Sequence, residues 1–182
     1  MNMEKNTHLN NIKEELEFLQ DLIPDTTGMS EAEVDKFWRK HLKRRIRTPC
    51  NEETLLLAFC LEHQQEIPEI VGYPLVIKYE YELVPGRSDC GKGDLVLSDG
   101  KENYLIVEAK YLTLKTGRNP RNANREKRNY AEKQKERNLR DFRWKHPEVT
   151  AQGYILTNKK LSEELQKVFE EYRQEYELSW KK

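Results

Sequence analysis

The order of the expected secondary-structure elements after residue 50 constrains the fold most. An apolar segment capped by Asn51 reads as a helix that runs to Pro68. From Leu75 to Leu83, large apolar residues alternate with Val76 and three charged residues, and this period of two predicts a half-buried strand. Two short strands follow at residues 94–98 and 104–111, on either side of the Asp99-Gly100 turn signal. After them come a helix at about 123–145, a strand at 151–157 and an amphipathic helix at 161–176.

The resulting order is α-β-β-β-α-β-α. Hairpins make neighbouring strands antiparallel, whereas a strand-helix-strand crossover makes them parallel. The chain is therefore expected to form an α/β fold in which helices flank a mixed central sheet.

Two further helices are expected before this core. Apolar residues from Leu9 to Ile23 are spaced 3, 4, 3, 4, which predicts an amphipathic helix over residues 8–22. A capping box opens a second helix that runs from Ser30 to about Ile46, with Val34, Trp38 and Leu42 inward. We expect residues 1–48 to form a helical extension and 49–182 the main domain. The Leu9–Ile23 stripe could cover the core or close a homodimer.

Charge is distributed unevenly although the formal net charge is zero. Seven Lys or Arg residues lie between Lys36 and Arg47. Between Lys115 and Lys145 there are twelve, against four acidic residues. Such clusters can track a phosphate backbone, but a solvated helix face is the plain alternative. The tryptophans Trp38, Trp144 and Trp180 are expected to be packing anchors.

The remaining composition bears on the compartment. Three cysteines form no CxxC pair, which is typical of a reducing environment. No segment approaches the roughly 20 apolar residues of a membrane span, and no apolar signal core opens the chain. We expect a soluble intracellular protein, in the cytoplasm or nucleus, that has no membrane partner.

Charged residues interrupt an apolar strand in the stretch YLIVEAKYL. Glu108 and Lys110 are two residues apart, so on a strand they project from the same face. With Asp94 from the preceding strand, Glu108 can supply carboxylate oxygens to Mg²⁺ or Mn²⁺. The ammonium of Lys110 would then lie beside the metal-bound water and beside the phosphate of a substrate that is cleaved there. A structural alternative is a buried Glu–Lys pair, although such pairs stabilise poorly relative to apolar residues.

This interpretation requires a particular hairpin register. In an antiparallel hairpin the sequence numbers of the two residues in each pair add up to the same value. Asp94 shares a face with Glu108 only if that value is even. A two-residue turn at Asp99-Gly100 gives an odd sum. A pairing of Ser98 with Tyr104 places Asp94 opposite Glu108, and leaves apolar residues to pack together on the other face, namely Leu95, Leu97, Leu105, Val107 and Ala109.

The Gly93-Asp94 pair, the triplet Glu108-Ala109-Lys110 and the element order together resemble the PD-(D/E)xK nuclease superfamily, over roughly residues 49–160. The resemblance implies a restriction-endonuclease-like or Holliday-junction-resolvase-like αβββαβ core. It makes Asp94 and Glu108 the metal ligands, together with the Ala109 carbonyl, and Lys110 the catalytic lysine. In such proteins another glutamate often lies on the helix before the first strand. Glu53 is our choice, with Glu52 close behind. Gly93 stands where the name-giving pattern has Pro, which leaves the subfamily open.

The resemblance implies a Mg²⁺-dependent nuclease that hydrolyses phosphodiester bonds, with DNA the favoured substrate. Lys110 would orient the attacking water and offset charge in the transition state. Candidate nucleic-acid contacts are Lys115, Arg118, Arg121, Arg125, Arg128 and Gln134. Two alternatives remain open, namely a nucleic-acid-binding protein of nuclease fold that does not cut, and a helical protein-interaction module.

Overall fold

The computed structural model describes residues 26–82 and 92–181. Residues Glu31–Lys182 form one compact unit. Its helices are α2 (Glu31–Arg45), α3 (Glu52–Glu62), α4 (Arg118–Lys145) and α5 (Glu163–Ser179), with short 3-10 helices η1 (Gln64–Glu66) and η3 (Asn158–Lys160). Its strands are β1 (Leu75–Glu82), β2 (Lys92–Ser98), β3 (Asn103–Lys110) and β4 (Thr150–Thr157). The helix expected over residues 8–22, on which the homodimer alternative depends, lies outside the described residues.

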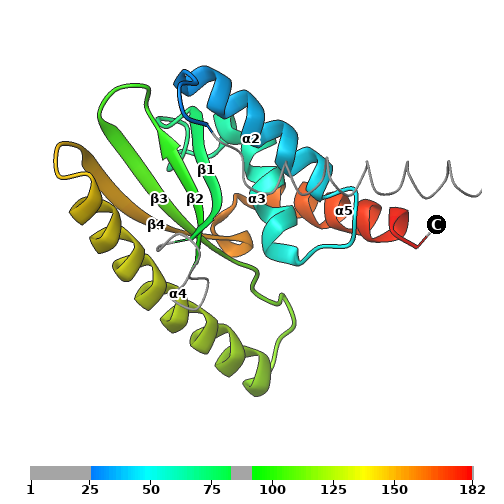
Figure 1. Cartoon of the computed structure of the whole chain (residues 1–182). Coiled ribbons are helices and arrows are strands. Elements are labelled where there is room, and N and C mark those ends of the chain that lie inside the picture. Colours follow the sequence, from blue (N-terminus) through cyan, green and yellow to red (C-terminus); the bar gives the residue numbers. More distant parts are fainter. Residues whose placement is uncertain (1–25, 83–91, 182) are drawn as a thin grey trace, which may run out of the picture. The chain divides into compact units, whose positions relative to one another are not determined.

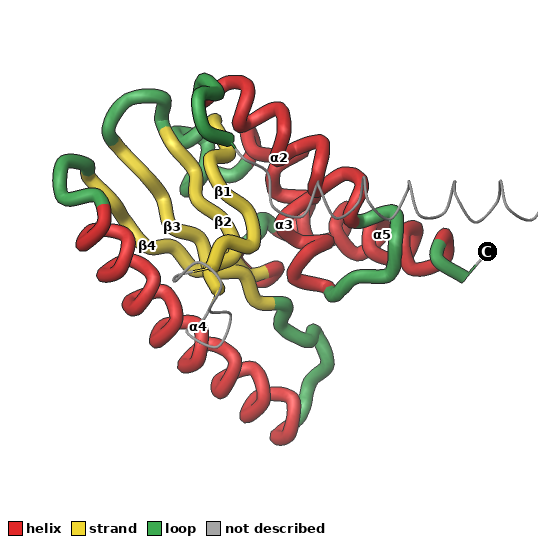
Figure 2. The backbone as a smooth tube through the Cα atoms, in the orientation of Figure 1, coloured by secondary structure: helices red, strands yellow, loops and turns green. Residues whose placement is uncertain are grey.

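The four strands form one mixed sheet in the order β1-β2-β3-β4. β1, β2 and β3 are antiparallel neighbours, whereas β3 and β4 are parallel and are joined through α4. The expected α/β class with a mixed sheet is confirmed. Figure 1 shows α4 along one face of the sheet and α3 and α5 on the other, and Figure 2 shows the same layers with the strands in yellow.

The two faces of the sheet bury different residues. The larger core lies between the sheet and helices α3 and α5, and it includes the five apolar residues that were expected to share a face, namely Leu95, Leu97, Leu105, Val107 and Ala109. On the opposite face, Val96 and Ile106 pack with Leu139 of α4. Even-numbered residues of β2 and β3 therefore face α4, and Asp94, Glu108 and Lys110 belong to this set.

The β2–β3 hairpin has the register that the site requires. Ser98 pairs with Tyr104. The backbone N–H of Asp99 donates to the carbonyl of Asn103 at 3.1 Å, which leaves residues 100–102 as a three-residue loop. Gly100 occupies the left-handed region with φ of +79°, where a side chain would be strained. The pairing sum is even, and the predicted register is confirmed.

β1 departs from the simple alternation that its sequence suggests. Its pairing with β2 shifts by one residue between Val76 and Lys78, so Ile77 forms a β-bulge. Val76 and Tyr79 consequently both belong to the larger core. The grouping of Val76 with the polar residues was wrong, because the bulge reverses the alternation at this point.

Helix α2 covers the outer edge of β1. An uncovered edge strand presents backbone groups that can pair with another chain, and proteins commonly cover such edges. Three side chains of α2 bond to backbone atoms at this edge: the Asp35 carboxylate accepts from the Val76 N–H at 2.8 Å, the Trp38 indole donates to the Ile77 carbonyl at 2.9 Å, and Arg39 donates to the Pro74 carbonyl at 2.7 Å.

Helix α4 begins at Arg118, about five residues earlier than expected. Residues 118–122, which were expected to precede the helix, therefore belong to it. Pro120 is the third helical residue. A proline is tolerated there because the N–H groups of the first turn have no partner within the helix.

The tryptophans differ in burial. Trp38 and Trp180 are packing anchors as expected, and the Trp180 indole donates to the Ile46 carbonyl at 3.0 Å. The same expectation was wrong for Trp144, which is 81% exposed near the end of α4. In the part of the chain that the structure describes, no helix has the length and apolar character needed to cross a membrane.

Candidate metal and phosphodiesterase site

The carboxylate of Asp94 lies where β2 and β3 part. The described pairing of β2 with β3 ends at Leu95, whereas its pairing with β1 continues to Lys92. Beyond Leu95, the Asp94 carboxylate accepts a hydrogen bond from the backbone N–H of Ala109 at 2.6 Å. The N–H and C=O of one strand residue point to the same neighbouring strand, so the Ala109 carbonyl also faces the Asp94 side.

Glu108 is the most deeply buried acidic group of the site. Its side chain is only 2% exposed. One carboxylate oxygen accepts from the Asn138 amide at 2.9 Å, and the other lies 3.6 Å from the Lys110 ammonium. Burial raises the pKa of Glu108 to about 8, and the negative charge of Asp94 adds to this increase, while Lys110 and Arg137 oppose it. Asp94 is therefore close enough for its charge to disfavour the ionised form of Glu108.

Lys110 reaches from Glu108 toward the surface. The short distance between their charged atoms confirms that the two side chains share a face. The Lys110 ammonium also lies 5.9 Å from the ring centre of Tyr130 on α4, and Tyr130 is 60% exposed. The ammonium is thus positioned between a buried carboxylate and an accessible aromatic ring.

Glu53 contacts the same edge of β3 from another direction. Asn51 caps α3 by accepting from the Thr54 N–H, so Glu53 lies in the first helical turn. Its carboxylate accepts from the Tyr111 N–H at 3.1 Å. Ala109 and Tyr111 are two residues apart, so in an extended chain their N–H groups point the same way, about 6.8 Å apart. Along this edge of β3, the Asp94 carboxylate contacts the Ala109 N–H and the Glu53 carboxylate contacts the next outward N–H, that of Tyr111. The Ala109 carbonyl lies between these two contacts.

One turn of α4 adds residues that sequence reasoning missed. Asn138 bonds Glu108 directly, and Arg137 is near enough for its charge to lower the pKa of Glu108. Gln134, which the resemblance suggested, lies one turn earlier with its Oε1 buried. Asn138 occupies a position between Ala131 and Phe142 on the packed side of α4. The sequence signal that could have identified Asn138 is a polar residue on a helix face that is otherwise apolar.

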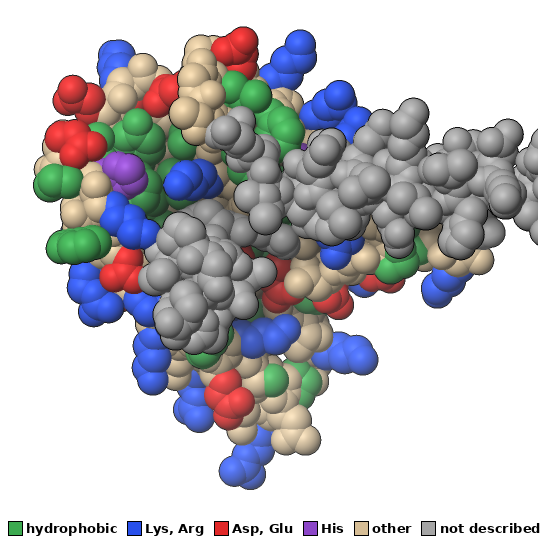
Figure 3. Space-filling model, in the orientation of Figure 1, with side chains coloured by type: hydrophobic (Ala, Val, Ile, Leu, Met, Phe, Trp, Pro, Cys, Tyr) green, Lys and Arg blue, Asp and Glu red, His purple; other side chains and the backbone are tan. Residues whose placement is uncertain are grey.

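The predicted basic contacts form a separate group. Lys115, Arg118, Arg121, Arg125 and Arg128 are all exposed. They occupy the loop before α4 and its first turns, which extend past the end of β3 (Figure 1). Asn124 holds this region to the loop by bonding both the N–H and the carbonyl of Thr113, at 3.1 and 3.0 Å. In Figure 3, Lys and Arg side chains in blue follow the border along which α4 runs in Figure 1.

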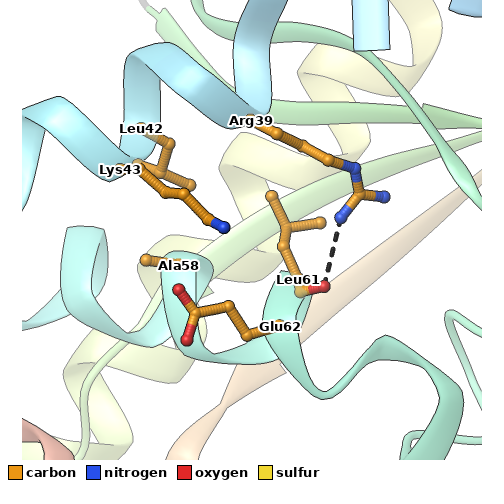
Figure 4. Close-up of a pocket in the computed structure, with 6 residues that line it drawn as sticks. All are labelled: Arg39, Leu42, Lys43, Ala58, Leu61 and Glu62. Atoms are coloured by element: carbon orange, nitrogen blue, oxygen red, sulfur yellow. Dashed lines mark hydrogen bonds between the residues drawn. The ribbon is translucent and has the colours of Figure 1, made fainter. Parts of the chain in front are cut away.

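The described residues also line two recesses at other places in the fold. One, of about 100 Å³, lies between α2 and α3, and Figure 4 shows Lys43 and Glu62 among the residues that line it. Arg39 borders it, and its guanidinium is bonded to the Leu61 carbonyl at 3.1 Å. The other, of about 450 Å³, is lined by Leu114 and polar residues of α5. Neither recess is lined by the carboxylates of the site.

The oxygen atoms present fit a divalent cation. Among the described residues, no group of three or more His, Cys, Asp or Glu side chains is placed to hold a metal ion. The candidate donor set consists of Asp94, Glu108 and the carbonyl of Ala109, all hard oxygens. Mg²⁺ commonly takes one or two carboxylates and keeps several waters, so this set suffices. A bound cation would also offset the repulsion that raises the pKa of Glu108.

Comparison with known proteins adds no relative to this description. No model of a protein family matches the chain, and no match was found among curated proteins or solved structures. The functional interpretation therefore rests on the residues of the site.

Proposed function

We propose that this chain is a metal-dependent nuclease, with DNA as the favoured substrate and with the αβββαβ core of the PD-(D/E)xK superfamily. The observation that carries the proposal is the convergence of two carboxylates and a lysine at the point where β2 and β3 part. Asp94 and Glu108 come from different strands, and each is held by a hydrogen bond, to Ala109 and Asn138 respectively.

A purely structural role for Glu108 and Lys110 accounts poorly for Asp94. If the pair existed for stability, a second carboxylate beside it would weaken it. Asp94 instead makes ionisation of Glu108 harder, and the separation of 3.6 Å is long for a strong ion pair. Groups whose pKa is perturbed by burial and by a like charge cluster at functional sites. The arrangement suits a site that receives a cation.

In this proposal each residue has a distinct task. Asp94, Glu108 and the Ala109 carbonyl would hold Mg²⁺ or Mn²⁺. The metal, when bound, supplies Lewis-acid polarisation of the phosphate and a lowered pKa for the attacking water. Lys110 would hold that water and offset the charge that develops on the phosphate. Glu53 supports the same edge by fixing the backbone at Tyr111.

The basic residues of α4 supply the nucleic-acid contact in the proposal. Four exposed arginines lie on its first turns, namely Arg118, Arg121, Arg125 and Arg128. A chain with no net charge gains affinity for a polyanion only through such local clusters. These turns extend past the strand that carries Glu108 and Lys110, which would place a bound backbone beside the carboxylates (Figure 1).

The test is cleavage of supercoiled plasmid, linear duplex and branched DNA, with RNA alongside, in Mg²⁺, in Mn²⁺ and in chelator. We expect metal-dependent cleavage by the parent and none by Glu108→Gln. Glu132→Gln, which removes an exposed acid of α4, should cleave like the parent. Binding without cleavage by the parent would favour the non-catalytic alternative. Neither binding nor cleavage of any substrate would favour the interaction module.

A further inference from the structure

Two aromatic side chains of helix α4 are left open to solvent. Tyr130 is 60% exposed and Trp144 is 81% exposed. Every other phenylalanine, tyrosine and tryptophan whose burial the structure describes is at least partly buried. Large aromatic side chains usually pack inside a protein or inside an interface, because most of their surface is apolar. Two open rings on one helix therefore indicate a surface that receives a ligand.

Tyr130 and Trp144 belong to one stripe along the helix. They are 14 residues apart with Arg137 midway, so the three side chains project to nearly the same side, with a drift of about 20° per seven residues. Lys133 and Arg140 lie in the intervals, each three or four residues from its neighbours. We call these five residues the aromatic stripe. It spans about 21 Å of helix.

The aromatic stripe carries positive charge. It contains three cations between its two rings. The carboxylates of Glu132 and Glu136 pair with Lys135, which lies outside the stripe and contacts Gly153 of β4. Asp141 lies 3.7 Å from Arg140, and with this one acid counted against the three cations the net charge is still +2. The surface therefore suits an anionic ligand that also has flat, stackable groups.

One end of the aromatic stripe lies at the candidate metal site. The Lys110 ammonium lies 5.9 Å from the centre of the Tyr130 ring, and the charge of Arg137 acts on Glu108. Trp144 lies at the other end, near the C-terminus of α4. The exposed arginines of the first turns of α4 precede Tyr130 along the helix. A strand that follows α4 would thus meet the arginines before the site and the aromatic rings after it.

We propose that the aromatic stripe binds an unpaired nucleic-acid strand, whose bases stack on Tyr130 and Trp144 while the three cations of the stripe contact its phosphates. The preferred substrate of the site is then single-stranded, or has a single-stranded branch beside the cleaved bond. This inference rests on the proposed function, since it names the substrate class of that site.

The accessibility of the base faces gives the reason. In a duplex the bases are stacked on one another, so an external side chain reaches phosphates and base edges but not base faces. In a single strand the faces are open, and any base can stack on an aromatic ring. At the roughly 3.4 Å per nucleotide of a stacked strand, the stripe spans about six nucleotides, which is within the range of single-strand-binding sites.

Binding measured in chelator tests the inference independently of cleavage. Fluorescence anisotropy compares a labelled thymidine strand of about 20 nucleotides, which exceeds the site, with the same strand paired to its complement. A uridine strand of equal length distinguishes RNA from DNA as the source of the unpaired bases. We expect Tyr130→Leu and Trp144→Leu each to weaken single-strand binding by about 5- to 150-fold, and duplex binding by less than about twofold. Tyr130→Phe and Trp144→Phe keep a ring and should keep most of the single-strand affinity.

Trp144 also supplies a direct signal. Trp38 and Trp180 pack against the larger core, so a base that stacks on Trp144 should quench the tryptophan fluorescence of the parent. The quenching should be absent in Trp144→Phe although this variant still binds. Leu178→Ala is the control, because Leu178 is an exposed apolar residue of α5, and it should bind strand and duplex like the parent. Tyr130 and Trp144 are exposed, so the leucine variants should unfold at the parent's midpoint.

The outcomes separate this inference from the proposed function. If both leucine variants bind the single strand as tightly as the parent, or lose strand and duplex equally, the inference is wrong, and metal-dependent cleavage by the parent would leave the proposed function standing. If they lose only the single strand while the parent cleaves no substrate, the stripe binds unpaired strands and the proposed catalysis is wrong. If the parent binds no nucleic acid, the inference is wrong and the exposed rings fit a protein partner instead.

Discussion

Replacing Glu108 with glutamine should stabilise the protein, and increasingly so as the pH rises. The glutamine keeps the shape of the side chain and an oxygen that can accept from Asn138. It removes the charge that burial and Asp94 disfavour. A residue selected for a cation site would thus weaken the metal-free fold, as expected where function and stability conflict.

The magnitude follows from the raised pKa. The value rises from 4.5 to about 8, and each pKa unit corresponds to about 1.36 kcal/mol, so the ionised form costs about 5 kcal/mol. Between these two values the folded protein keeps a proton that the unfolded chain has released, so stability falls as pH rises through this window. Relative to the parent, Glu108→Gln should gain about 1 kcal/mol at pH 5, about 3 at pH 7 and about 5 at pH 9.

Urea unfolding in chelator at these three pH values measures the difference. Glu132→Gln is the control, because Glu132 is 56% exposed and pairs with Lys135 on the surface. Such pairs contribute about 0–1 kcal/mol, so this variant should follow the parent. If Glu108→Gln is less stable than the parent at pH 9, Glu108 and Lys110 form a stabilising pair and the reasoning is refuted.

Three other outcomes are expected. Asp94→Ala should abolish cleavage and weaken Mg²⁺ binding in calorimetry, whereas Lys110→Ala should retain Mg²⁺ and lose about 10²–10⁴ in cleavage rate; parental cleavage by a folded Lys110→Ala would contradict its catalytic role. Arg121→Ala and Arg125→Ala should each reduce the log-log salt slope of duplex DNA binding by about 0.9, and binding that ignores salt would argue against phosphate contacts. Arg39→Met should lower the free energy of unfolding in urea by about 3 kcal/mol. The reason is that four hydrogen bonds join the Arg39 guanidinium to α2, to the α3 region and to the β1 edge. An unchanged unfolding midpoint would contradict this.

Local patterns determined the order of the elements and the residues of the central motif. The period of two in β2 and β3, with an odd loop between them, places Asp94, Glu108 and Lys110 on one face. Periodicity is a property of neighbouring residues, so it can be read without a structure. Two predictions from local patterns were wrong for local reasons. The bulge at Ile77 reversed the alternation in β1, and α4 begins before Pro120 and not after it.

Only the tertiary structure decided which polar groups meet. The bonds that build the site join residues far apart in the chain: Asp94 with Ala109 over 15 residues, Glu108 with Asn138 over 30, and Glu53 with Tyr111 over 58. No periodic pattern specifies such pairs, because they depend on how α3 and α4 pack against the sheet. The same packing buries Glu108 beside Asp94, and burial is what raises its pKa. The sequence by itself thus determined the candidate site residues and their shared face, whereas their environment and supporting partners came from the fold.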